Sequence, residues 1–306
     1  MLIKLLLKTC QFIRLQLLSI IVIVVNLINL PTSYAEQAIE LNPTVVNTPI
    51  AKDEFEWQFM VDFSLVDSQY LLADVEQSNV VDYFQLGLLL DMSYKGFFIR
   101  QNSRRSSSAL GGAEIGYQLT LKEDWQLEFI LKTYVNGYEP SELLKDNNVP
   151  QLEGLAERKA TTGLALRYSH FFDDAIFYFD IAAASAFDDN QYGNSSGLIV
   201  DSFYSYLIPY RNWDIYLGAG LTYYSQAIND YYIGINANEV TNNRPLFEAE
   251  SNYRAQFEIY AQYPLSNSWF LNTGVTQSFY LNNIKKSPLI NRNKITQAVI
   301  GVLYVF

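Results

Sequence analysis

The chain has 306 residues, of which 49% are hydrophobic and 15% aromatic, and its 32 acidic residues outnumber 21 basic ones to give a net charge of −11. Such an acidic protein repels nucleic acid, so DNA and RNA are excluded as partners. Cys10 is the only cysteine and His170 the only histidine. We therefore expect no disulfide, no metal site and no cofactor in the mature protein.

The first 35 residues have the order of a secretory signal peptide. Three basic residues flank and precede an apolar stretch at 17–28, and the small-x-small pattern Ser33-Tyr34-Ala35 follows it. We expect cleavage after Ala35. Because residues 1–35 carry three bases and no acid, cleavage changes the net charge from −11 to −14. A retained membrane anchor is the alternative, since the apolar stretch is long for a signal.

From residue 55 onward, apolar and polar residues alternate in segments of roughly 9 to 11 residues, the length that crosses a bilayer as a tilted strand. Leu217 and Phe257 fall on apolar faces, whereas the next residues, Gly218 and Glu258, fall on polar faces. A polar face is expected where it lines water and the other face meets lipid. Strands are expected at 55–65, 83–91, 95–102, 111–121, 125–136, 160–171, 175–186, 197–208, 213–223, 253–263, 268–281 and 294–306.

Twelve such strands predict an all-β fold, a transmembrane antiparallel up-and-down β-barrel formed by residues 55–306. The barrel must close because lipid offers no hydrogen-bond partner to a sheet edge. The hairpin at 83–102 has the least regular alternation, so ten or fourteen strands remain open. A secreted β-sandwich is the competing fold, and it would have shorter strands.

Short links and long polar stretches alternate along the chain. In barrels of this kind the short turns face the periplasm and the long loops face outward. Residues 36–54 then form a periplasmic N-terminal extension. The short links are 122–124, 173–174, 209–212 and 264–267, and the long stretches are 139–159, 187–196, 225–250 and 282–293.

The last strand ends the chain on an aromatic pattern. Tyr304 and Phe306 share one face with small or apolar residues at earlier alternate positions. This resembles the C-terminal signal by which the barrel-assembly machinery recognises bacterial outer-membrane barrels. The resemblance implies a cell outer-membrane location in a Gram-negative envelope, surrounded by outer-membrane lipid and lipopolysaccharide. Arg104 and Arg105 would be able to bind lipopolysaccharide phosphates if their loop lies outside, but we favour the interpretation that they lie in a solvated turn.

Several motifs in order resemble those of the MltA-interacting protein family, also called MipA/OmpV. The resemblance runs from about residue 55 to 306. Its most distinctive parts are a loop with Tyr231, Tyr232 and Gly234 and a second loop with Ser287 and Pro288. Its other parts are the runs 112–117 and 230–235, Trp125, the region of Arg158 and Gly163, Glu239, Tyr253, Trp269, Leu289 and the closing run 301–306.

The family resemblance implies a non-enzymatic scaffold that links a murein lytic transglycosylase to a peptidoglycan synthase. Two alternatives stay open: a porin-like solute channel, and a surface adhesin or envelope-stress protein. The periplasmic turns and the 36–54 extension would carry partner contacts in the scaffold. Lumen charges would serve the channel, and the long loops would serve the adhesin.

Catalysis by a barrel of this type needs a histidine as proton carrier beside a nucleophile or an orienting carboxylate. His170 is preceded by Ser169, but adjacent residues of a strand point to opposite faces. We interpret His170 as an interfacial residue at a strand end. No catalytic residue is assigned, and we expect no enzyme activity.

Charged residues on the polar faces are candidates for the lumen. They are Glu114, Arg167, Arg254 and Glu258, with Asp62, Glu128 and Asp180. Rings of such charges can select solutes. We favour the other interpretation, in which they pair across a lumen filled by side chains, because a twelve-strand barrel has a modest bore.

Overall fold

The computed structural model describes residues 55–77, 80–101, 112–187, 195–282 and 284–306. The expected signal peptide (1–35), the N-terminal extension (36–54) and Arg104-Arg105 lie outside the described residues. The strands are β1 (Glu56–Ser68), β2 (Phe84–Tyr94), β3 (Phe97–Gln101), β4 (Ala113–Leu121), β5 (Trp125–Val135), β6 (Thr161–Phe171), β7 (Ala175–Ser185), β8 (Ser196–Tyr210), β9 (Trp213–Tyr224), β10 (Asn252–Pro264), β11 (Trp269–Tyr280) and β12 (Lys294–Val305). The connections contain α3 (Pro140–Asp146), α4 (Gln226–Ile233) and the 3-10 turns η1 (Val80–Tyr83), η2 (Pro150–Leu152), η3 (Ala237–Glu239) and η4 (Ile284–Lys286).

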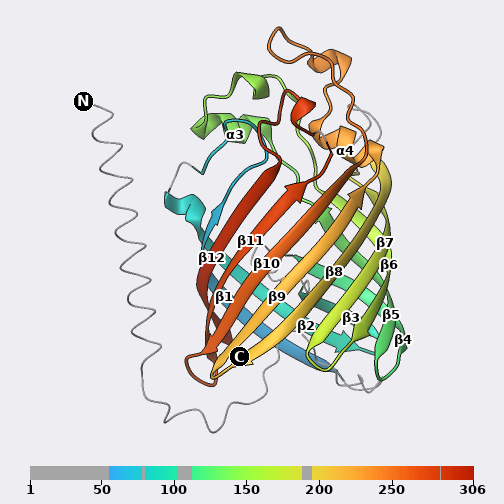
Figure 1. The fold of residues 1–306 in the computed structure, drawn as a ribbon, viewed down its shortest axis with the longest axis vertical. Coiled ribbons are helices and arrows are strands. Elements are labelled where there is room, and N and C mark those ends of the chain that lie inside the picture. Colours follow the sequence, from blue (N-terminus) through green and yellow to red (C-terminus); the bar gives the residue numbers. More distant parts are fainter. Residues whose placement is uncertain (1–54, 78–79, 102–111, 188–194, 283) are drawn as a thin grey trace, which may run out of the picture. The chain divides into compact units, whose positions relative to one another are not determined.

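These twelve strands of the described chain form one closed antiparallel sheet (Figure 1). Each strand pairs with its neighbours in chain order, and β1 pairs with β12, with Phe63 opposite Val302. Pairing of the first strand with the last closes the sheet, as a lipid environment requires. The predicted twelve-strand up-and-down barrel is confirmed, and the uncertain hairpin at 83–102 forms β2 and β3.

The barrel wall has an apolar outer face and a mainly polar inner face. Leu217 and Phe257 point outward and are 39% and 54% exposed, whereas Gly218 and Glu258 point inward and are buried. Gly218 lies directly opposite Glu258, and a Cβ at this glycine would collide with the side chains of Glu258 and Phe203. The glycine makes room for the carboxylate, and the predicted register of β9 and β10 is confirmed.

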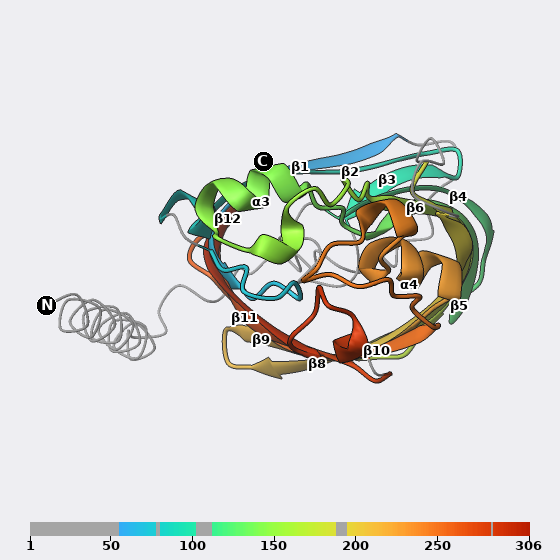
Figure 2. The same ribbon diagram turned by 90° about the horizontal axis from the view of Figure 1, so that it is seen from above.

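The two ends of the barrel differ. At one end, consecutive strands are joined by turns of two to four residues, at 95–96, 122–124, 172–174, 211–212 and 265–268. At the other end, the long connections after β1, β5, β9 and β11 converge over the mouth (Figure 2). The predicted long stretches 139–159, 225–250 and 282–293 lie at this end, whereas most of the stretch 187–196 lies outside the described residues.

One predicted turn is shorter than expected. Residues 209–212 were expected to form a link, but Pro209 and Tyr210 extend β8 and only Arg211 and Asn212 make the turn. Tyr210 pairs with Trp213, and Arg211 has a φ of 55°. The missing N–H of a proline is tolerated near a strand end, where the hydrogen-bonded ladder stops.

The end of β12 joins a group of aromatic rings at the short-turn end of the barrel. The ring of Phe306 lies 5.1 Å from that of Phe59 and 4.7 Å from that of Tyr304, and Tyr304 lies 4.8 Å from Trp269. Phe306 itself is 67% exposed on the outer face. Such aromatic girdles mark the level where a barrel meets the membrane interface.

We expect that Phe306→Ser impairs assembly into the outer membrane while export continues, because the change removes the terminal ring from an accessible outer-face position. Heat-modifiable migration and the outer-membrane yield measure this effect. Phe172→Ser is the control, since Phe172 is also an exposed aromatic residue at the same end but lies in a turn. Equal yields from the two variants would contradict the expectation.

Candidate functional site

The inner wall carries a cluster of ion pairs centred on Arg167. Its guanidinium donates two hydrogen bonds to Glu114, at 2.6 and 2.9 Å, and two to Asp180, at 2.6 and 2.9 Å. All three residues are at most 1% exposed. Bidentate pairing of a planar guanidinium with carboxylates combines strong hydrogen bonds with a fixed geometry. This part of the lumen is therefore filled by paired side chains.

Two further bases extend the cluster along the wall. Lys132 Nζ lies 2.8 Å from Asp180 and 3.4 Å from Asp201, while Arg100 donates to both oxygens of Glu128, at 2.6 and 3.0 Å. Asp180 and Asp201 lie directly opposite each other on β7 and β8, and the lysine between them offsets their repulsion. We call the following set the inner charge cluster: Arg100, Glu114, Glu128, Lys132, Arg167, Asp180 and Asp201.

The strand register brings these charges together. Arg167 of β6 lies directly opposite Glu128 on β5 and Asp180 on β7, and Lys132 lies opposite Glu114. Directly opposed residues have Cβ atoms about 4.5–5.5 Å apart, so their side chains meet without any loop to position them. The geometry of the cluster thus follows from the alternation of each strand and from the pairing of neighbours.

Two further predicted lumen charges, Arg254 and Glu258, lie on β10, and Asp62 is buried on β1. Arg254 donates to Thr222 Oγ1 at 3.2 Å, and Thr222 donates to Asp201 at 2.7 Å, so Arg254 lies at the edge of the inner charge cluster. Glu258 faces the lumen four residues further along the strand. Arg100 and Asp201 were not among the lumen charges predicted from the sequence. Alternation along β3 and β8 places both residues on the inner face. The pattern is hard to recognise in the sequence because other residues of the same face, such as Phe98, are apolar.

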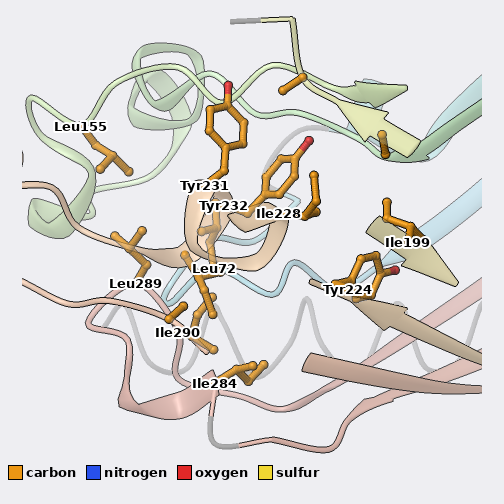
Figure 3. Close-up of a cluster of buried hydrophobic side chains, with 14 of the residues drawn as sticks. Leu72, Leu155, Ile199, Tyr224, Ile228, Tyr231, Tyr232, Ile284, Leu289 and Ile290 are labelled. Atoms are coloured by element: carbon orange, nitrogen blue, oxygen red, sulfur yellow. The ribbon is translucent and has the colours of Figure 1, made fainter. Parts of the chain in front are cut away.

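The long connections close together over the barrel mouth. We call the described residues of 69–77, 136–160, 225–251 and 281–293 the loop cap. Its buried residues, among them Leu72, Ile228 and Leu289, are continuous with apolar residues of the upper inner wall such as Ile199 (Figure 3). An apolar core of this kind excludes water. The loop cap is therefore a packed layer joined to the wall.

The residues of the two family-like loops lie inside the loop cap. Tyr231 Oη accepts a hydrogen bond from the backbone N–H of Lys159, and Tyr232 Oη donates to the carbonyl of Lys159. Ser287 Oγ donates to the carbonyl of Ile233 at 2.6 Å. These hydrogen bonds join three connections that are far apart in sequence.

The other two residues of the family-like loops are Gly234 and Pro288. Gly234 follows α4, and a Cβ there would collide with Asp230, whose backbone oxygen accepts from the N–H of Gly234. Pro288 is half-buried between Ser287 and Leu289, which are both at most 2% exposed. Tyr231, Tyr232, Gly234 and Ser287 therefore have packing roles, because each contacts other residues inside the loop cap.

A buried ion pair also joins two of the connections. Arg158 Nη2 donates to Glu239 Oε2 at 3.0 Å, and the N–H of Ala156 donates to Glu239 Oε1. Burial by itself raises the pKa of Glu239, but the hydrogen bond and charge of Arg158 outweigh it and hold this pKa below its ordinary value. Glu239 therefore stays ionised at neutral pH. Arg244 adds hydrogen bonds to the carbonyls of Glu239 and Gln151, at 2.8 and 2.6 Å.

The single histidine lies at the other end, on the outer face of β6. Its ring centroid lies 4.5 Å from that of Phe172, and Tyr168 Oη lies 3.1 Å from Nδ1. Ser169, the preceding residue, is 2% exposed on the inner face. His170 is therefore surrounded by aromatic rings and points away from Ser169.

The turns beside His170 carry exposed acids. Glu123 and Asp124 lie in the β4–β5 turn, and Asp173 and Asp174 lie in the β6–β7 turn. The N–H of Phe171 donates to the carbonyl of Asp124 at 2.8 Å, which holds the two turns side by side. They form one acidic surface at the short-turn end.

Within the described ranges, no group of three or more His, Cys, Asp or Glu residues has the arrangement that holds a metal ion. None of the helices in the described parts of the chain has the length and apolar character needed to cross a bilayer.

A closed antiparallel barrel with an apolar, aromatic outer face and a largely polar inner wall is the architecture of outer-membrane β-barrel proteins. The protein is of this class and resides in the outer membrane. Residues 48–306 match the family model described as MltA-interacting protein MipA, and the chain belongs to this family.

Named relatives carry the same location in their descriptions. The chain is 20% identical over 237 residues to the 24 kDa outer membrane protein of Pasteurella multocida, covering 77% of this chain and 86% of that protein. It is 22% identical over 161 residues to the outer membrane protein OmpV of Vibrio cholerae. That match covers 53% of this chain and 60% of OmpV, which is less than two thirds of the Vibrio protein.

Among solved structures, the NanC porin resembles the chain with 10% sequence identity and a TM-score of 0.39, covering 80% of this chain and 98% of the porin. The family assignment does not depend on this likeness.

Proposed function

We propose that this protein acts by binding, as a non-enzymatic outer-membrane scaffold that holds a murein lytic transglycosylase and a peptidoglycan synthase. The family description, MltA-interacting protein, supports a partner of the first kind. The observation that carries the proposal is the packed loop cap above an ion-paired inner wall. A barrel closed in this way is suited to presenting its surfaces rather than to passing solutes.

The short-turn end is the surface that we assign to the partners. Short turns of outer-membrane barrels face the periplasm, where murein lies. Here the adjacent turns present Glu123, Asp124, Asp173 and Asp174, with Phe172 50% exposed among them. Charged groups around an exposed aromatic anchor are a common arrangement at protein interfaces. Residues 36–54 would add contacts on the same side.

Affinity capture from crosslinked envelopes tests the proposal. We expect the wild-type protein to capture murein enzymes, and we expect less capture after reversal of the β4–β5 turn charges by K122E, E123K and D124K. Deletion of residues 36–54 should also weaken capture. The control reverses the exposed Glu142–Lys145 pair of α3, at the opposite end of the barrel, by E142K and K145E. If the control variant loses as much capture as the turn variant, the loss does not depend on the short-turn end, and this surface is not the partner site.

His170→Ala should leave capture and the cellular phenotype intact, because His170 lies among aromatic rings on the outer face. Loss of function in this variant with normal barrel assembly would refute a role by binding alone. Bilayer recordings test the channel alternative. If no murein enzyme is captured and a steady conductance changes in the Arg254→Gln protein, the channel replaces the scaffold.

A further inference from the structure

The last part of the chain carries a concentration of positive charge. Residues 259–306 contain no Asp or Glu, and their four bases, Lys285, Lys286, Arg292 and Lys294, fall within the connection from β11 to β12 and the first residue of β12. The whole chain has a net charge of −11, so this stretch differs in sign from the protein around it.

Buried anchors hold this connection in place. Ile284, Ser287 and Leu289 are at most 3% exposed. The carbonyl of Leu289 accepts from the N–H of Ala73 at 2.7 Å, and Ser287 Oγ is held by the carbonyl of Ile233. Lys285 and Lys286 lie between these anchors and are exposed. A packed backbone therefore presents the two lysines, which lowers the conformational entropy lost when they bind a ligand.

Lys294 lies on the outer face of the wall, at the level of the membrane interface. Lys294 lies directly opposite Phe279, and both are exposed on the outer face of the wall. Leu281, beyond Phe279, is 59% exposed. Outward aromatic residues mark the interface, and a lysine beside them extends its ammonium to the headgroups. Figure 2 shows η4, which includes Lys285 and Lys286, at the rim of the barrel mouth.

Carboxylates do not neutralise these bases within the described residues, where no acidic oxygen lies within 4.0 Å of their side-chain nitrogens. Asn291 separates Arg292 from the acid of a neighbouring loop: Asn291 Nδ2 donates to Asp74 at 3.2 Å, and Arg292 Nε lies 3.4 Å from Asn291 Oδ1. The positive charge thus remains available to an external anion.

We propose that Lys285, Lys286, Arg292 and Lys294 bind the phosphate groups of lipopolysaccharide in the surrounding outer leaflet. Ammonium and guanidinium groups pair strongly with phosphate oxygens. Lipid is favoured over a soluble anion because Lys294 projects from the lipid-facing side of the wall. The long loops of outer-membrane barrels face outward, so the rim meets the leaflet that contains this glycolipid. The site is independent of the proposed scaffold role.

Binding of bisphosphorylated lipid A to the full-length mature barrel, reconstituted in nanodiscs of zwitterionic lipid, tests the site. We expect K285Q/K286Q/K294Q to weaken binding on the order of 100-fold, since each lysine near an anionic surface contributes about fivefold. The matched control, K95Q/K122Q/R211Q, removes three exposed bases from the short-turn end and should bind like wild type. Heat-modifiable migration shows that each variant is folded. If the triple variant does not fold, K285Q and K286Q are measured singly, and each should weaken binding about fivefold.

Two further lipids serve as controls: dephosphorylated lipid A, which lacks the phosphate charges, and phosphatidylglycerol, which is added at the same charge density as bisphosphorylated lipid A. The proposal requires weak binding to both, with inorganic phosphate competing poorly. Equal affinity of the triple variant and wild type would overturn the site, as would equal binding to dephosphorylated lipid. Equal, lysine-dependent binding to phosphatidylglycerol would overturn the assignment to lipopolysaccharide and leave a general anionic surface. Strong competition by inorganic phosphate would overturn the assignment to lipid.

Discussion

Arg167→Met is expected to destabilise the folded barrel by about 3–5 kcal/mol, because it removes one partner of a buried ion-paired group and leaves the others charged. Glu114 would lose both of its short hydrogen bonds from the guanidinium, and Asp180 would keep, among the described residues, Lys132 and a 3.3 Å hydrogen bond from Tyr134. A urea titration of refolding in lipid vesicles measures the loss. Methionine retains much of the length of the arginine side chain, so packing changes less than charge.

A second substitution separates charge from packing in this experiment. Glu114→Gln in the Arg167→Met background removes one stranded carboxylate, and we expect it to recover part of the stability. Non-additive behaviour of this kind is the signature of residues that share one network. A single-variant loss below about 1 kcal/mol, the range of exposed ion pairs, would mean that water enters the cluster and screens it.

The barrel wall was predictable because its determinants are local. Alternation assigns each strand residue to a face, and neighbouring strands pair in chain order. Leu217 and Phe257 were placed outward, and Glu114 and Arg167 were placed on polar faces, from this rule alone. The ends of β8 were less predictable, since Pro209 signals a turn in sequence but lies within the last residues of the strand.

The loop cap was not predictable in the same way. Its contacts join residues that are far apart in sequence, such as Tyr138 and Tyr232, whose hydroxyl and carbonyl groups meet at 2.7 Å. No periodic pattern marks a loop residue as buried. Leu72 and Val75 are buried in the loop cap, although their connection was not among the long stretches predicted from the sequence. The motif with Tyr231 and Tyr232 was visible, but only the structure places it in a packing role.

The loop cap helps to explain why the inner charge cluster is stable although its charges are buried. The inner charge cluster occupies β3 to β8, and the apolar wall residues above it, such as Ala165, Ala182 and Ile199, are continuous with the core of the loop cap. Exclusion of water by that core strengthens the ion pairs beneath it, because their attraction grows as the local dielectric constant falls. Damage to the cap should therefore weaken the cluster as well.

Leu217→Arg and Phe257→Arg are each expected to destabilise the barrel by about 2–4 kcal/mol, the range for arginine on the lipid face near the bilayer midplane. Both residues lie in the middle of their strands, on the outer face of adjacent β9 and β10. The guanidinium would have to leave water and enter the hydrocarbon region, where no acidic partner faces it. Refolding titrations of the single variants in lipid vesicles measure the cost.

Leu265→Arg is the matched control for these two substitutions. Leu265 is 51% exposed, a value between those of the two strand residues, but it lies in the β10–β11 turn, where an arginine remains in water. We expect a change of at most about 1 kcal/mol there. A strand register shifted by one residue would turn Leu217 and Phe257 into the lumen. Both arginines would then meet polar side chains, so the absence of a loss at both sites would contradict the register itself.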